Sequence, residues 1–115
     1  MEPDNRIHIV NINASKIVSW NAFHSYFQKK FGFPDFYGRN MNAWIDCMGD
    51  LDKPEHGMTT NFSIRKGEYL VIRLVNVAEL KMKAHDIYIA LLECSAHINN
   101  RRISAGEHPL IFLAF

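Results

Sequence analysis

The sequence lacks the features that define several large protein classes. It has only two cysteines, Cys47 and Cys94, and no CxxC motif, which excludes a disulfide-stapled miniprotein and argues against a zinc site. We expect both to be reduced thiols. No apolar run approaches the roughly 20 residues that a membrane-spanning helix needs. The first residues are neither basic nor apolar as in a signal peptide, so we expect a cytoplasmic protein with no membrane association.

Signatures of catalysis are also missing. The sequence contains no phosphate-binding loop, dinucleotide-binding or nucleophile-elbow pattern. Its six histidines include no HxxxH pair accompanied by an acid. Both cysteines follow an acidic residue, which raises the pKa of a thiol and makes it a poor nucleophile. We therefore expect no enzyme, no cofactor and no bound metal.

What is present suits one folded domain over residues 1–115. The chain has 115 residues, 48% of them hydrophobic, which is enough for one core and too few for two. The formal net charge is +1, but residues 33–56 hold five acids against two Lys or Arg. A nucleic-acid binder needs the opposite bias in its contact element, so we expect no direct nucleic-acid partner.

Three segments have the alternating or β-branched composition of strands, namely residues 6–12, 68–75 and 109–115. The first alternates as a strand with one flank near solvent does. The second is a nearly continuous apolar run, which predicts a central strand buried on both faces.

Four segments carry apolar residues at helical spacing, namely residues 20–31, 41–51, 77–82 and 84–98. Ser19 suits the N-cap of the first helix, and Gly32 ends it in a left-handed conformation. Trp20 lies on its apolar face together with three phenylalanines. The order β-α-α-β-α-α-β favours an α/β fold with a small parallel sheet covered by helices.

Two connections draw attention. Residues 33–40 are rich in turn formers, because Pro34 fixes φ and Gly38 permits a positive φ. They also carry two aromatic residues, Phe36 and Tyr37, that we expect to be exposed. Residues 52–67 show little periodicity, so we expect a long loop that is either functional or partly mobile.

The second predicted helix has a polar face. Asn42, Asp46 and Asp50 recur every four residues, and Gly49 leaves room for close approach. Such a stripe is most often a solvated surface. However, like charges at this spacing repel, a cost that a purely structural helix has no reason to carry. With aromatic residues just before the helix, the stripe also suits a protein interface.

Residues 33–51, FPDFYGRNMNAWIDCMGDL, resemble the barstar family of intracellular ribonuclease inhibitors. The family pattern runs roughly Pro-acid-Tyr-Tyr-Gly-x-Asn-Leu-Asp-Ala-Leu-x-Asp-Cys-Leu. The resemblance implies a three-stranded parallel sheet packed against about four helices. It also implies an inhibitor, monomeric when free, that covers the active site of a secreted or toxin-type ribonuclease with its second helix and the preceding connector.

The resemblance carries functional roles to individual positions. Asp46, directly before the cysteine, corresponds to the family's main helix carboxylate. Phe36 occupies a contacting tyrosine position, and Asn42 stands where the family has aspartate. Glu93 is the only acid in the middle of the last long helix, where the family has another carboxylate. The contact residues implied are therefore Phe36, Asn42, Ile45, Asp46, Gly49, Asp50 and Glu93, with Gly38 and Asn40 shaping the turn and capping the helix.

The sequence departs from the family pattern at some of these positions, and Asn42 in place of aspartate reduces the negative charge of the expected surface. An alternative is therefore a barstar-fold interaction module for a different nuclease toxin or for a partner that is not a nuclease.

Overall fold

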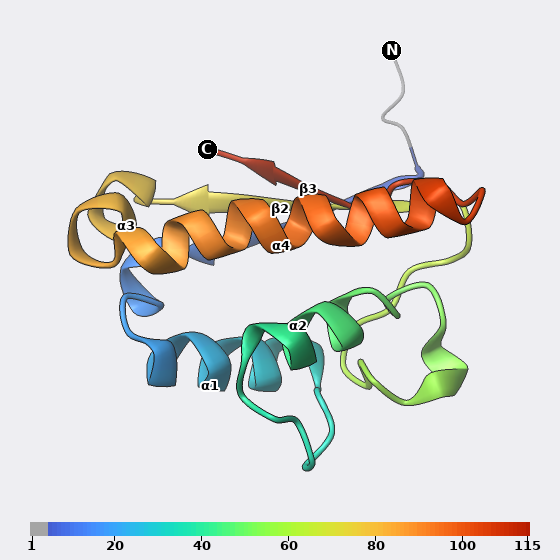
Figure 1. Cartoon of the computed structure of the whole chain (residues 1–115), viewed down its shortest axis with the longest axis horizontal. Coiled ribbons are helices and arrows are strands. Elements are labelled where there is room, and N and C mark those ends of the chain that lie inside the picture. The colour runs from blue at the N-terminus through green and yellow to red at the C-terminus, as the bar shows by residue number, and fades with distance from the viewer. Residues whose placement is uncertain (1–4) are drawn as a thin grey trace.

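A three-stranded parallel sheet carries the helices of this protein (Figure 1). The computed structural model describes residues 5–115. Its elements are β1 (Ile7–Asn13), η1 (Ala14–Lys16), α1 (Trp20–Phe31), α2 (Met41–Met48), η2 (Pro54–His56), β2 (Tyr69–Val75), α3 (Val77–Lys83), α4 (His85–Ser104) and β3 (Ile111–Ala114). The predicted α/β fold and its order of elements are confirmed, and β2 is the central strand.

Only one face of the sheet is covered by helices. On β2, Leu70, Ile72 and Leu74 are buried, whereas Arg73 and Val75 are exposed. The prediction that this strand is buried on both faces is therefore wrong. An apolar run cannot reveal whether a second covering layer exists, and here the apolar side chains of the open face cover one another, as the rings of Tyr69 and Phe112 do at 5.9 Å.

Helix α1 begins and ends where the sequence predicts. The Oγ atom of Ser19 accepts a hydrogen bond from the backbone N–H of Ala22 at 3.1 Å, and Gly32 adopts a φ of 72°. Trp20 departs from the expectation, because it is 37% exposed and its Nε1 atom donates to Asp86. It lies in the first turn, at the edge of the helix bundle.

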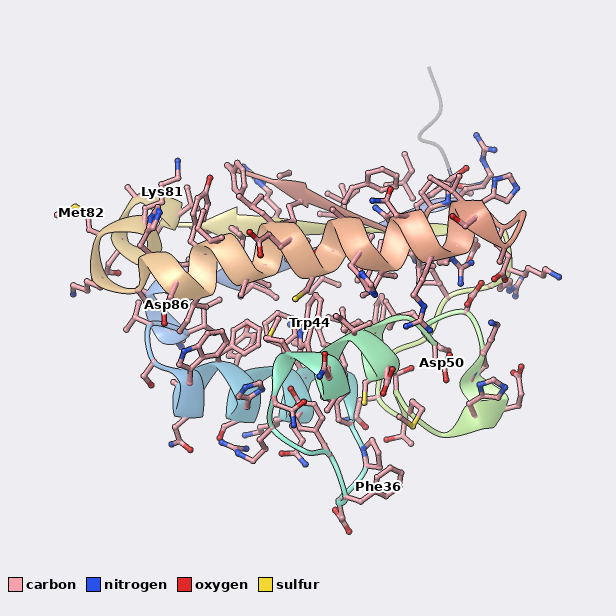
Figure 2. The ribbon with its side chains drawn as sticks, in the orientation of Figure 1. Phe36, Trp44, Asp50, Lys81, Met82 and Asp86 are labelled. Carbon is pink, nitrogen blue, oxygen red and sulfur yellow. The ribbon has the colours of Figure 1, made fainter. Side chains whose placement is uncertain are left out.

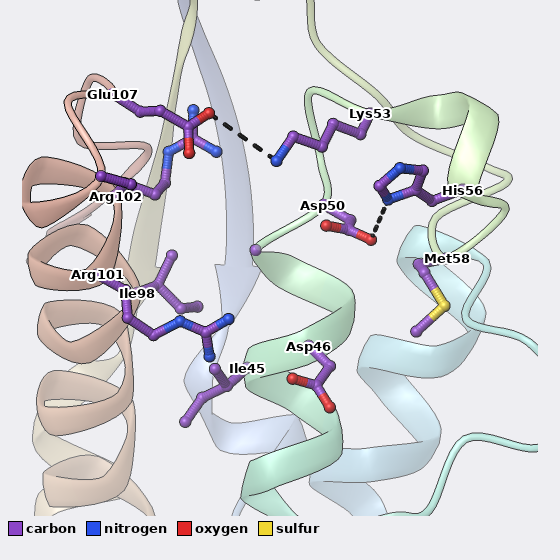
Figure 3. A pocket seen from close by; sticks show the side chains of 12 residues that line it. Ile45, Asp46, Asp50, Lys53, His56, Met58, Ile98, Arg101, Arg102 and Glu107 are labelled. Carbon is purple, nitrogen blue, oxygen red and sulfur yellow. Dashed lines mark hydrogen bonds and ion pairs between the residues drawn. The ribbon is translucent and has the colours of Figure 1, made fainter.

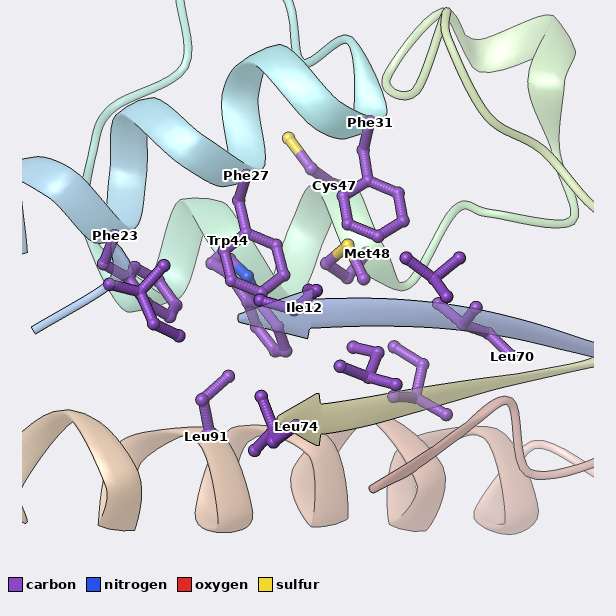
Figure 4. Close-up of a cluster of buried hydrophobic side chains, with 14 of the residues drawn as sticks. Ile12, Phe23, Phe27, Phe31, Trp44, Cys47, Met48, Leu70, Leu74 and Leu91 are labelled. Carbon is purple, nitrogen blue, oxygen red and sulfur yellow. The ribbon is translucent and has the colours of Figure 1, made fainter. Parts of the chain in front are cut away.

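The core lies between α1, α2 and the covered face of the sheet (Figure 4). Phe23, Phe27 and Phe31 are fully buried one turn apart along α1. The ring of Phe27 meets that of Trp44 on α2 edge to face at 5.6 Å. Aromatic contacts of this kind fix the rotation of α2 about its axis as well as burying apolar area.

Two helices differ in length from the prediction. Helix α4 continues to Ser104, well past the expected end at Ile98. Asn99 does not end it, because its side chain bonds the backbone of Leu110 and Ile111 beside β3 and leaves the helical backbone intact. Helix α2 is shorter than predicted and has its C-cap at Gly49, a residue that favours helix ends.

The segment 52–67 is pinned to the helices rather than irregular throughout. It contains η2, and the backbone N–H groups of Thr60 and Asn61 donate to carbonyls at the end of α1. Ile64 is buried, and its N–H donates to the carbonyl of Leu51. These bonds hold the segment beside the C-terminal ends of α1 and α2.

A buried ion pair joins this segment to α4. The guanidinium of Arg102 makes two hydrogen bonds to the carboxylate of Asp52, at 3.2 and 2.7 Å. The two side chains are 9% and 2% exposed. The Nε atom of Arg102 also donates to the carbonyl of His108 at 2.8 Å. The pair therefore fixes the C-terminal part of α4 against the chain that leaves α2.

We predict that Gly32→Ala destabilises the protein more than Gly57→Ala does. Both glycines have a φ near +70°, so each substitution carries about 1–2 kcal/mol of backbone strain. Only at position 32 does the new Cβ collide, lying 2.5 Å from the backbone nitrogen of Asn61. Urea unfolding should show an additional loss of about 1–3 kcal/mol for Gly32→Ala. Equal losses would mean that this close approach does not constrain the fold.

Asp52→Ala should lower the free energy of unfolding by about 3–5 kcal/mol, because it leaves the charge of Arg102 buried without a partner. Asp35→Ala is the matched control. It removes one exposed carboxylate and should change stability by less than about 0.5 kcal/mol. Thermal or urea unfolding measures both, and similar values for the two variants would contradict the structural role of the ion pair.

Candidate functional site

The connector between α1 and α2 presents one aromatic side chain and buries the other. Phe36 is 77% exposed at the tip of the loop (Figure 2). Tyr37 is buried, contrary to the prediction, because its hydroxyl hydrogen-bonds Nδ1 of His24 at 2.5 Å and its ring packs on Phe33. Burial raises the pKa of Tyr37. Burial, and then the charge of Arg39, lower the pKa of His24, which favours its neutral form.

The turn before α2 is built differently from the prediction. The positive φ, 53°, belongs to Arg39 and not to Gly38. The Arg39 guanidinium holds this conformation by donating to Asn21 and Ser25 on α1. Gly38 instead permits close approach, since a Cβ there would lie 3.1 Å from the side chain of Asn40.

Helix α2 separates buried from exposed residues sharply. Asn40 caps it by accepting a hydrogen bond from the N–H of Ala43 at 2.8 Å. Trp44 and Met48 are fully buried, whereas Asn42 and Asp46 are exposed. Burying Trp44 turns Asp46 outward, because two residues span about 200° of an α-helix.

Both cysteines are free thiols, as expected. Burial, together with the charges of Asp46 and Asp50, raises the pKa of Cys47 to about 11. Burial and Glu93 raise the pKa of Cys94 in the same way. Protonated thiols in such surroundings are poor nucleophiles and fill space in the core.

A groove of about 520 Å³ lies between α2 and the C-terminal part of α4 (Figure 3). One wall comprises Ile45, Asp46, Gly49 and Asp50 from α2 and its end. The opposite wall includes Ile98, Arg101 and Arg102 from α4 and its C-cap, Ala105. Residues of the 52–67 segment, Lys53, His56 and Met58, close one end.

The groove brings together four of the seven predicted contact residues. Ile45, Asp46, Gly49 and Asp50 all line it. Asn42 and Phe36 are exposed but lie outside the lining, toward the start of α2 and its connector. Glu93 is exposed on α4 and also lies outside the groove lining, N-terminal to the part that faces α2.

Asp50 corrects the picture of a continuous acidic stripe. It lies beyond the end of α2, and its carboxylate is 2.9 Å from Nδ1 of His56 on η2. Asp50 is therefore not a residue of α2, and its carboxylate has a partner that the carboxylate of Asp46 lacks. The carboxylate of Asp46, by contrast, forms no hydrogen bond or ion pair with any of residues 5–115.

Sequence reasoning missed the α4 wall. Arg101 and Arg102 lie beyond residue 98, where the predicted helix ends, and the α4 wall therefore had no predicted contact residues. Once α4 is extended to Ser104, the spacing of Ile98, Arg101, Arg102 and Ala105 places all four toward α2. The signal was present in the periodicity, but the polar pair at 99–100 masked it.

Other chemistries find little support in the part of the chain that the structure describes. Within residues 5–115, no group of three or more His, Cys, Asp or Glu side chains is placed to hold a metal ion. The described helices include none with the length and apolar character to cross a membrane. The exposed features at the groove are side-chain charges and apolar contacts, which suit recognition of another molecule.

Comparison with known families agrees with this architecture. A sequence model of the family described as barstar (barnase inhibitor) matches residues 7–114, which run from the first residue of β1 to the last residue of β3. No curated protein matches the sequence. The match covers the whole sheet, all helices and both walls of the groove. The chain therefore belongs to the barstar family, a family of barnase inhibitors.

Proposed function

We propose that this protein is an intracellular ribonuclease inhibitor, an immunity protein of the bacterial type that binds a secreted or toxin-type ribonuclease. It acts as a monomer in the cytoplasm and catalyses nothing. Membership of an inhibitor family supports this role in general. The observation that carries the specific binding face is the unpaired, exposed carboxylate of Asp46 at the groove.

The charge of Asp46 suits the active site of a ribonuclease. Such a site must be cationic because it binds the phosphates of RNA. A carboxylate held outward on a rigid helix substitutes for a phosphate and pairs with those cations. Opposite charges also steer the two proteins together, for which barnase and barstar are the standard example.

The remaining contacts surround this carboxylate. Phe36 offers a ring on the connector, and Asn42 offers an amide that retains an acceptor without the charge of aspartate. Ile45 contributes an apolar surface in the groove. Inhibition then follows from covering the active site, with Asp46 central and less polar contacts around it, as in other protein interfaces.

We predict that Asp46→Ala weakens inhibition of a barnase-like ribonuclease by roughly 30-fold or more, or about 2 kcal/mol, because an active-site cation loses its partner. Initial rates of RNA cleavage at low salt, titrated with inhibitor, measure the effect. Glu79→Ala is the matched control, because it also removes one carboxylate. Glu79 lies on α3, next to the N-terminal end of α4, whereas the groove lies at the C-terminal end of α4 (Figure 1). It should leave inhibition nearly unchanged.

The assignment of the face fails if Asp46→Ala and Glu79→Ala behave alike. Wild-type protein that does not inhibit would contradict the proposed function. That result would favour a different nuclease toxin, or a protein that is not a nuclease, as the binding partner. Affinity capture from the source cell would then identify it.

A further inference from the structure

Two charged side chains in the groove differ from the others because they have no hydrogen-bond or ion-pair partner among the described residues. Most of the charged side chains there are already paired: His56 with Asp50 at 2.9 Å, Lys53 with Glu107 at 3.9 Å, and Arg102 with Asp52 at 2.7 Å. The side chains of Asp46 and Arg101, by contrast, form no hydrogen bond or ion pair with any described residue. The groove therefore presents one free carboxylate and one free guanidinium.

These two charges lie on opposite walls. Asp46 belongs to α2, and Arg101 extends from α4 into the groove toward that helix (Figure 3). Between them lie apolar side chains, Ile45 on α2 and the buried Ile98 on α4. Both charges are exposed, and they do not pair with each other. Each is available to a separate group on a binding partner.

A partner that fills the groove must satisfy both charges. In open water, each is solvated and exerts little force. When a partner displaces that water, a charge left without a counter-charge opposes binding. A surface that presents only cations would pair with Asp46 but would face Arg101 with a like charge, which is unfavourable across an interface.

We propose that the partner places a carboxylate against Arg101 beside the cation that it places against Asp46, so that the groove recognises a pair of opposite charges. This inference rests on the proposed function and specifies its partner. A site that cleaves RNA by general acid–base catalysis sets proton-transferring groups such as carboxylates among the cations that bind phosphate. A single ribonuclease active site thus supplies both the cation for Asp46 and the carboxylate for Arg101. Substituting Arg101 tests whether the partner's carboxylate is present.

Arg101→Glu gives a test in which the direction of the effect is decisive. Its affinity for a catalytically inactive barnase-like ribonuclease is measured by calorimetry and compared with that of Arg73→Glu. Arg73 is also exposed and unpaired among the described residues, but it lies on the open face of the sheet, away from the helices. Both variants change the net charge equally, so their difference removes the effect of overall charge.

We expect Arg101→Glu to bind roughly tenfold more weakly than Arg73→Glu at about 0.01 M salt, and the difference to shrink near 1 M salt, where charges are screened. Arg101→Gln, which keeps a polar side chain, should show a smaller loss in the same direction. Circular dichroism of each variant confirms that the helices are retained.

Tighter binding by Arg101→Glu than by Arg73→Glu would overturn the inference, because it would show a uniformly cationic partner surface. Equal binding would overturn it as well. In both cases the proposed function stands if Asp46→Ala still weakens binding. If the wild-type protein does not bind the ribonuclease at all, the proposed function fails and this inference fails with it.

Discussion

The packing of Trp44 against the phenylalanines of α1 is the constraint on which the rest of the binding face depends. Its indole ring is fully buried and meets the ring of Phe27 at 5.6 Å. Helical geometry then leaves α2 no freedom of rotation, because Trp44 and Met48 must face the core. Asp46 consequently points outward, on a helix whose N-terminus is capped by Asn40 and whose connector is bonded to α1. A carboxylate positioned by buried aromatic rings is a rigid contact for a partner.

The second wall of the groove depends on a different force. The side chains of Arg102 and Asp52 are nearly inaccessible to solvent. They form an ion pair with two hydrogen bonds. This pair ties the C-terminal part of α4 to the segment that follows α2. Arg101, the adjacent residue, is then held at the surface facing α2. Apolar packing thus orients the α2 wall, which carries Asp46, and a buried ion pair positions the α4 wall, which carries Arg101.

The sequence predicted the fold well because its local signals agreed with one another. Ser19, Gly32 and Asn40 act at helix ends as their chemistry favours, and the order of strands and helices favoured a small parallel sheet, which the structure has. The open face of β2 was not predictable in the same way, because an apolar run does not state how many layers cover it. The length of α4 was misjudged for a related reason. Asn99 has a tertiary partner in the β3 strand, and only the fold reveals it.

The candidate site was predictable only where the family pattern is contiguous in sequence. Asp46 stands directly before a cysteine in that pattern, so its place was clear. Arg101 and His56 reach the groove from distant segments, and Asp50 changes its role because α2 ends earlier than its periodicity suggests. Contacts between segments far apart in the chain decide such features, and helical spacing alone does not contain them.

The most direct measurement is a titration of the isotope-labelled protein with a barnase-like ribonuclease, followed through backbone amide chemical shifts. We expect the changes to concentrate at Asp46, Gly49 and Arg101, on the two walls of the groove. Amides on the open face of the sheet, such as those of Val71 and Phe112, should stay unchanged. Changes concentrated on that sheet face, with the groove unaffected, would contradict the account.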